Sequence, residues 1–216
     1  MLTRRLFALA LTVALAGCVT SVPPLSVDEI KTWKVVSVEG IVAPVARSGW
    51  MSVAHDFRKL KGLEIIVKPS EERGLPQQII EPALPLEEYR AYVASQFSQR
   101  VKTSFTGPLQ GQFHGTRPVR IVVSMHDALI LDGNARFGAI LLSGQSGDEN
   151  TLTASIDVID ARTGKTLLTF PQSITRGTGG SLGLALSGGP IIENDPMVRM
   201  LNQLHERFTT WLLKRA

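Results

Sequence analysis

One group of residues in this chain could carry out hydrolysis through a serine nucleophile. The segment from Gly179 to Gly183 reads GGSLG and matches the G-x-S-x-G pattern, in which a serine on a sharp turn attacks an ester or amide. Asp195 and His205 follow Ser181, so Ser, Asp and His occur in the chain order that such hydrolases use.

The elements that must position these residues argue against a catalytic triad. The turn pattern needs a helix directly after it, but the following segment, LGLALSGGP, is rich in glycine and ends in proline, so it is a poor helix. Asp195 precedes Pro196 at the start of a predicted helix, where its side chain would cap the first turn. His205 lies ten residues further on, about 15 Å along the same helix. We therefore expect no catalytic residues and no enzyme.

No pattern for a metal, a cofactor or a nucleic acid stands out. The four histidines are scattered, and His126 and Asp127, as neighbours in a predicted strand, should face opposite sides and not share an ion. The glycine run is not followed by the Gly-Lys-Ser/Thr of a phosphate loop. There is also no basic patch with interleaved aromatic residues, as nucleic-acid binding would require.

The first 17 residues have the pattern of a secretory signal peptide. Arg4 and Arg5 precede an apolar run from Leu6 to Ala16, which is too short to span a bilayer permanently. Removal of residues 1–17 takes away both arginines and no acid, so the formal net charge falls from +4 to +2.

The end of this segment, Leu15-Ala16-Gly17-Cys18, resembles the lipobox of bacterial lipoproteins. The resemblance implies a diacylglyceryl group on Cys18, cleavage before it, and acylation of the new amino group with a fatty acid such as palmitate. Cys18 is the only cysteine, so no disulfide within the chain is possible. Two or more acyl chains anchor a protein stably, so the membrane is the first expected partner. Val19, in place of an aspartate, implies sorting to the periplasmic face of the outer membrane.

The remainder predicts an extended tether at 18–32 and a single α+β domain at 33–216. Strands are predicted at 33–44 and 62–69, a loop at 70–85, and an amphipathic helix at 86–105 that Gly107 and Pro108 end. A strand at 117–131, a hairpin at 151–170 with a turn at 160–165, and a final amphipathic helix after Asp195 follow. This order predicts an antiparallel β-sheet with both helices packed on one face.

Several segments together resemble a family of bacterial lipoproteins without assigned activity, best known from alphaproteobacteria. They are the lipobox, WKVVSV from Trp33, GTRPVRIVVSMHDALIL, the ARTGKTL turn, and the glycine-rich run before the last helix. More distantly, the chain is similar to auxiliary lipoproteins of ABC transport systems. Neither resemblance supplies catalytic positions, and the chain departs from the first family at Gly144 to Asn150.

We therefore expect a lipid-anchored, non-enzymatic binding or accessory subunit of the periplasm with an envelope protein as its partner. The alternatives are a carrier of a lipid or another apolar ligand and, third, a serine hydrolase. The glycine-rich run at 177–189 holds Leu182, Leu184 and Leu186, which either pack under the final helix or contact a partner or the membrane.

Overall fold

The computed structural model describes residues 26–63, 66–68, 78–80, 82–131, 150–177 and 195–215. Cys18, Ser181 and the three leucines of the glycine-rich run lie outside these ranges, as do the signal peptide and most of the predicted tether. The other predicted elements all fall at least partly inside them.

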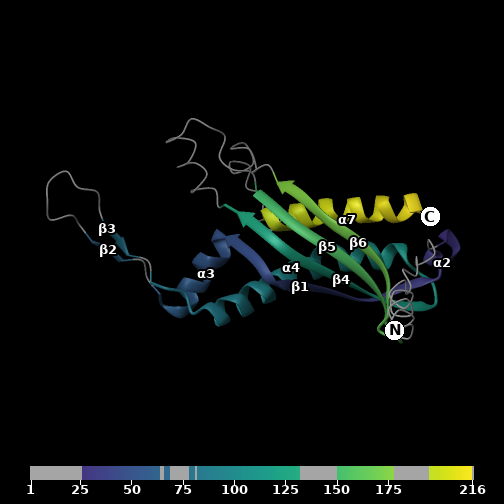
Figure 1. Ribbon diagram of the computed structural model, residues 1–216, viewed down its shortest axis with the longest axis horizontal. Coiled ribbons are helices and arrows are strands. Elements are labelled where there is room, and N and C mark those ends of the chain that lie inside the picture. The colour runs from purple at the N-terminus through teal and green to yellow at the C-terminus, as the bar shows by residue number, and fades with distance from the viewer. Residues whose placement is uncertain are drawn as a thin grey trace, which may run out of the picture.

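The chain is an α+β protein, as predicted, with a four-stranded sheet at its centre (Figure 1). In chain order the elements are α2 (Val27–Lys31), β1 (Trp33–Trp50), α3 (Met51–Lys61), β2 (Ile66–Lys68), β3 (Gln78–Ile80), α4 (Leu86–Gln112), β4 (Arg117–Ile130), β5 (Asn150–Asp160), β6 (Thr166–Gly177) and α7 (Pro196–Arg215).

The folded domain begins earlier than predicted, because the last part of the expected tether is helical. The hydroxyl of Ser26 caps α2 by accepting a hydrogen bond from the backbone N–H of Glu29 at 3.2 Å. Ile30 is only 4% exposed and belongs to the hydrophobic core. Burial of this side chain holds residues 26–31 against the domain, and the prediction of an extended segment up to residue 32 was wrong there.

The sheet has the order β1-β4-β5-β6, and two of its three strand pairs are antiparallel. The prediction of an antiparallel sheet was wrong for the third pair, β1 with β4, which run parallel. The long helix α4 lies between these two strands in sequence and carries the chain back to the end of the sheet where β1 began, which is the connection that parallel neighbours need. The predicted hairpin is present as β5 and β6, with Gly164 at a φ of 72° in its turn.

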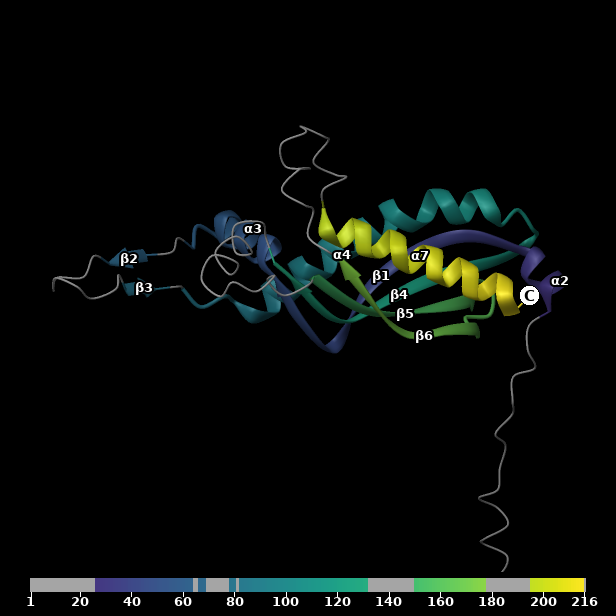
Figure 2. The same cartoon turned by 90° about the horizontal axis from the view of Figure 1, so that it is seen from above.

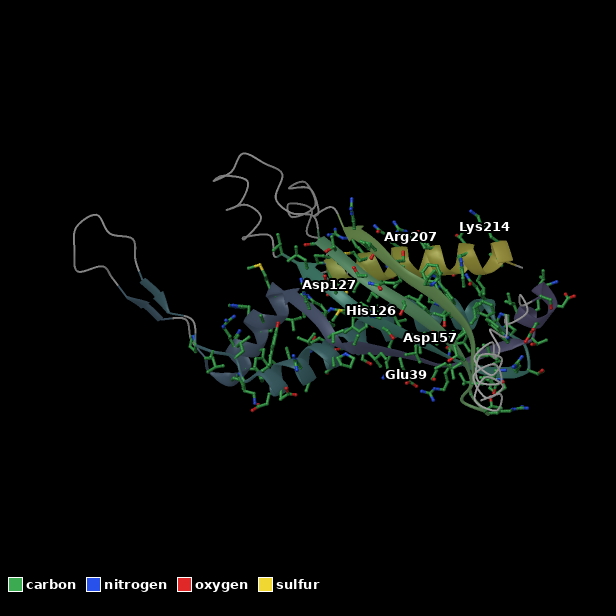
Figure 3. All side chains as sticks on the ribbon, viewed as in Figure 1. Glu39, His126, Asp127, Asp157, Arg207 and Lys214 are labelled. Atoms are coloured by element: carbon green, nitrogen blue, oxygen red, sulfur yellow. The ribbon has the colours of Figure 1, made fainter. Side chains whose placement is uncertain are left out.

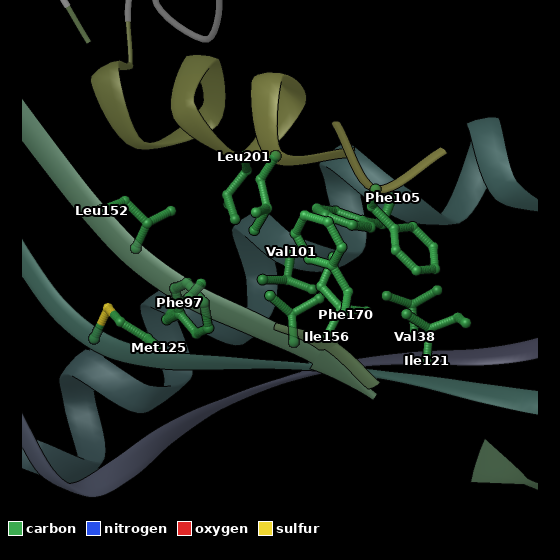
Figure 4. Close-up of a cluster of buried hydrophobic side chains, with 14 of the residues drawn as sticks. Val38, Phe97, Val101, Phe105, Ile121, Met125, Leu152, Ile156, Phe170 and Leu201 are labelled. Atoms are coloured by element: carbon green, nitrogen blue, oxygen red, sulfur yellow. The ribbon is translucent and has the colours of Figure 1, made fainter. Parts of the chain in front are cut away.

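Helices α4 and α7 pack side by side on one face of the sheet, as predicted (Figure 2). Side chains from both helices and the sheet fill the space between these layers (Figure 4). Phe97, Val101 and Phe105 of α4 are fully buried there, as are Leu201 and Phe208 of α7. In β5 buried and partly exposed residues alternate over the whole strand, so its second face is turned away from the helices.

Helix α4 crosses β1 at unusually short range, and Gly40 makes this possible. A Cβ atom at position 40 would lie 2.9 Å from Val101 Cγ2 and 3.0 Å from Ser98 Cα. The absence of a side chain at Gly40 therefore sets how closely the helix approaches the sheet.

Three local predictions differ from the structure. The strand predicted at 62–69 is reduced to β2, which pairs with β3, inside the predicted loop, and not with the main sheet. No element is predicted between the strands at 33–44 and 62–69, but residues 45–61 form the end of β1 and then α3. Helix α4 continues past Pro108 to Gln112, because Leu109 is fully buried and its packing outweighs the helix-breaking effect of the proline.

Candidate functional site

Asp195 holds the start of α7 in place through two interactions. Its Oδ1 accepts a hydrogen bond from the backbone N–H of Met197 at 2.8 Å, which confirms the predicted N-cap. Its Oδ2 forms an ion pair with Arg100 Nε of α4 at 2.7 Å, with both side chains about one-fifth exposed. The guanidinium of Arg100 also lies over the ring of Trp50, 4.7 Å from its centroid. Asp195 therefore ties α7 to α4 and β1.

His205 lies in the interface between the two helices. Its ring meets the edge of Phe105 with centroids 5.3 Å apart, and the residue is 9% exposed. Burial lowers the pKa of His205, and the charge of Glu206 opposes this only in part. Asp195 and His205, which follow Ser181 in the order of a hydrolase triad, thus both have structural roles.

His126 and Asp127 lie on the same side of the sheet, contrary to the expectation from simple alternation (Figure 3). Met125 pairs with Ala154 and Asp127 with Thr153, so His126 is an extra residue in β4. Apart from Val122, the buried positions shift accordingly, from odd numbers between Val119 and Met125 to even numbers from Ala128. Such a bulge turns both of its residues toward the face that the helices leave uncovered.

The bulge does not create a metal site among the described residues. His126 Nε2 lies 2.8 Å from Ser155 Oγ on the neighbouring strand, so the ring forms a hydrogen bond with Ser155. In the described part of the chain no three side chains of the metal-binding types come together. The pairing of His126 with Ser155 was not predicted, because the strand register that brings them together depends on the bulge.

A pocket of about 500 Å³ lies where β1 departs from regular pairing with β4. Val42 pairs with Met125 and Arg47 with Asp127, so β1 inserts four residues opposite the single extra residue of β4. The inserted segment and Ser48 form one wall, and residues 86–94 of α4 form the other. Most of the lining is aliphatic, and Glu87 and Arg90 at the edge form an exposed ion pair at 3.4 Å.

Tyr89 supplies the aromatic part of this pocket. Its ring centroid lies 5.4 Å from that of Phe57 on α3, which fixes one side of the ring. Burial raises the pKa of Tyr89, while the positive charge of Arg58 works against that rise. The phenol is therefore neutral at pH 7 and can donate a hydrogen bond. Tyr89 is partly buried and packs against the hydrophobic core, whereas Leu86, the first residue of α4, is 57% exposed.

A second, shallower hollow of about 400 Å³ lies between the edge strand β6 and the outer side of α7. Phe170 and Trp211 form its apolar side, with ring centroids 5.1 Å apart. Glu206, Arg207 and Lys214 supply charge around it, and Arg207 donates a 2.6 Å hydrogen bond to the carbonyl of Ile174. This hollow combines aromatic and cationic groups along the edge strand of the sheet.

In the ranges that the structure describes, no helix is both long and apolar enough to span a membrane. The helices there are amphipathic elements of the domain.

Comparison with known proteins leaves the family open. No family model matches the chain, and no curated protein matches it. Among solved structures, the chain is similar to the crystal structure of protein XCC0632 from Xanthomonas campestris, of family DUF330, at 12% identity and a TM-score of 0.34. The alignment covers 91% of this chain and 89% of that chain. A likeness at this TM-score carries no argument about function.

Proposed function

We propose that this protein is a lipid-anchored lipoprotein of the cell envelope, which acyl chains on Cys18 hold at the periplasmic face of the outer membrane. There it acts as a non-enzymatic binding or accessory subunit for an envelope protein. The observation that carries the proposal is the sequence Leu15-Ala16-Gly17-Cys18 directly after a short basic and apolar leader. Several acyl chains at one residue give stable membrane attachment.

The position of the first residue that the structure describes is compatible with such an anchor. Seven residues separate Cys18 from Ser26, at which the described structure begins. Even a fully extended segment of this length reaches only about 27 Å, so the domain would stay next to the bilayer that holds Cys18.

The contacts of Asp195 and His205 support a non-enzymatic role. Asp195 is engaged by Arg100 and by the backbone of α7, and His205 is buried against Phe105. Catalysis by these residues would require both sets of contacts to break.

Metabolic labelling with an alkyne fatty acid tests the anchor. We expect the wild-type chain and a Thr20→Ala control to take up the label and to be processed, and Cys18→Ser to do neither. Labelling of Cys18→Ser would refute the anchor. Density-gradient fractionation tests the sorting separately, because wild-type protein found only in the inner membrane would contradict the outer-membrane assignment and leave the anchor intact.

A serine-reactive fluorophosphonate probe tests the hydrolase alternative. We expect no labelling of the wild-type chain beyond that of a Ser181→Ala variant. A label that is present in the wild type and disappears in Ser181→Ala would establish a nucleophilic serine and overturn the non-enzymatic proposal.

The pocket between β1 and α4 favours a second candidate function, a carrier of an apolar ligand. Its volume of about 500 Å³ lies within the range of small-molecule sites, and its walls are mainly aliphatic. Ala94 lines it, so Ala94→Phe should fill it, whereas Gln99→Phe on the exposed side of α4 should not. A fluorescent fatty acid that binds the wild type and Gln99→Phe but not Ala94→Phe would support a carrier, and equal binding by all three would exclude this pocket.

A further inference from the structure

We infer that one end of the domain is a docking surface for an anionic phospholipid bilayer. This surface, called the α2 end below, consists of α2, the start of β1, the turn between β5 and β6, and the last turn of α7. The inference rests on the proposed anchor for the orientation of the domain, and it adds a specific lipid-binding face to that anchor.

The strand register brings these segments to the same end of the sheet. Trp33 at the start of β1 pairs with Arg117 at the start of β4, and Val119 of β4 pairs with Asp160 at the end of β5. Helix α7 runs antiparallel to β6, since Arg207 contacts Ile174 and Trp211 packs on Phe170. The end of α7 therefore lies beyond the start of β6, near α2 in both views (Figures 1 and 2).

The α2 end carries positive charge that the described residues do not neutralise. Its carboxylates are all in ion pairs, Asp28 with Lys31 and both Glu29 and Asp160 with Arg117, so these three acids exceed their two partners by one negative charge. Four further cationic side chains are exposed and make no ion pair within the described ranges: Lys34, Arg162, Lys165 and Lys214. A cluster of this kind complements a surface of anionic headgroups.

Apolar side chains lie beside these cations on α7. Leu213 is 64% exposed, and Trp211 is partly exposed while it packs against Phe170. Lys214, labelled in Figure 3, follows them and lines the same hollow as Trp211. Aromatic, aliphatic and basic residues in this combination are typical of segments that lie at a membrane interface.

The length and attachment point of the tether indicate which occupant this surface has. The segment after Cys18 joins the folded domain at α2, so it brings the α2 end toward the bilayer, while α3 lies at the opposite end of the sheet (Figure 1). A reach of at most about 27 Å keeps the cationic cluster close to the headgroups. Attraction between them increases docking roughly fivefold for each cation near an anionic surface.

Tryptophan fluorescence of the full, lipidated chain in vesicles tests this docking. Trp33 and Trp50 are each 1% exposed, so a bilayer-resident brominated lipid should quench mainly Trp211. We expect quenching in vesicles of phosphatidylglycerol and phosphatidylethanolamine, little in phosphatidylcholine, and a loss of quenching at high salt. The lipid-dependent quenching should disappear in a Trp211→Phe variant, which would show that Trp211 is its source.

Two matched charge variants locate the surface. Lys165→Gln with Lys214→Gln should weaken docking roughly tenfold to thirtyfold, as a shift in the anionic-lipid fraction needed for half-maximal quenching. Arg47→Gln with Lys59→Gln removes the same charge from exposed positions toward the α3 end and should leave docking unchanged. Thermal unfolding of both variants confirms that they are folded, and the salt titration of the wild type gives a second readout without any substitution.

Equal quenching in anionic and zwitterionic vesicles, or equal behaviour of the two double variants, would overturn the inference. Acyl labelling of Cys18 in the same preparation separates this result from a failure of the anchor. Labelled protein without lipid-dependent quenching refutes only the docking surface, whereas quenching without labelling refutes only the anchor.

Discussion

Replacement of Asp195 tests whether this residue holds α7 in place. Asp195→Ala removes the N-cap, which contributes about 1 kcal/mol, and the charge-assisted contact with Arg100, which contributes about 1.5–3 kcal/mol in a partly buried setting. We therefore expect the free energy of unfolding to fall by about 2–4 kcal/mol. Asp195→Asn keeps a good capping side chain and loses only the charge, so it should cost less, about 1–2 kcal/mol.

Urea unfolding, followed by circular dichroism, measures both variants. At a slope of about 2 kcal/mol per molar urea, Asp195→Ala should shift the midpoint by about 1–2 M. Unfolding midpoints of Asp195→Ala within about 0.3 M of the wild type would refute the structural role. If Asp195→Asn were as destabilised as Asp195→Ala, the cap would contribute nothing, and the ion pair alone would explain the effect.

Three further predictions concern packing and pH. Gly40→Ala forces a Cβ against Val101 and should cost about 1–3 kcal/mol, so an unchanged Tm would contradict the close approach of α4. Hydrogen bonds from the Thr163 backbone and from Arg117 lower the pKa of Asp160 from 3.8 to about 2, so its contribution to stability is complete above about pH 4 and is lost as the pH falls through 2. Between pH 5 and 2 the free energy of unfolding should fall less for Asp160→Asn than for the wild type. An equal fall for both proteins would contradict this prediction. Burial lowers the pKa of His205 below 6.5, so protonation of His205 should lower the free energy of unfolding as the pH falls below 6.5. In His205→Gln the free energy of unfolding should depend less on pH in this range, and an unchanged dependence would contradict the prediction.

Periodicity alone predicted most of the regular elements. Apolar residues at intervals of three and four identified α4 and α7, and strict alternation identified β5, because each pattern depends only on the local geometry of a helix or a strand. The cap at Asp195 was predictable for the same reason, since it requires only the next few residues. The lipobox is also a local signal, read from four consecutive residues.

Contacts between distant segments decided the rest. The parallel pairing of β1 with β4, the burial of Ile30 that extends the domain to α2, and the continuation of α4 past Pro108 depend on partners far away in sequence. The bulge at His126 moves every later residue of β4 to the opposite face of the sheet from the one that simple alternation predicts. The position of this bulge depends on the pairing with β5, so no local sequence pattern predicts it. The pocket beside Tyr89 and the charged α2 end also depend on long-range contacts. The two walls of the pocket, which end at Ser48 and begin at Leu86, are about 40 residues apart in the sequence, and the α2 end joins Lys31 to Asp160 across more than 100 residues. The sequence thus determined the elements and the proposed anchor, and tertiary packing determined which surfaces those elements expose.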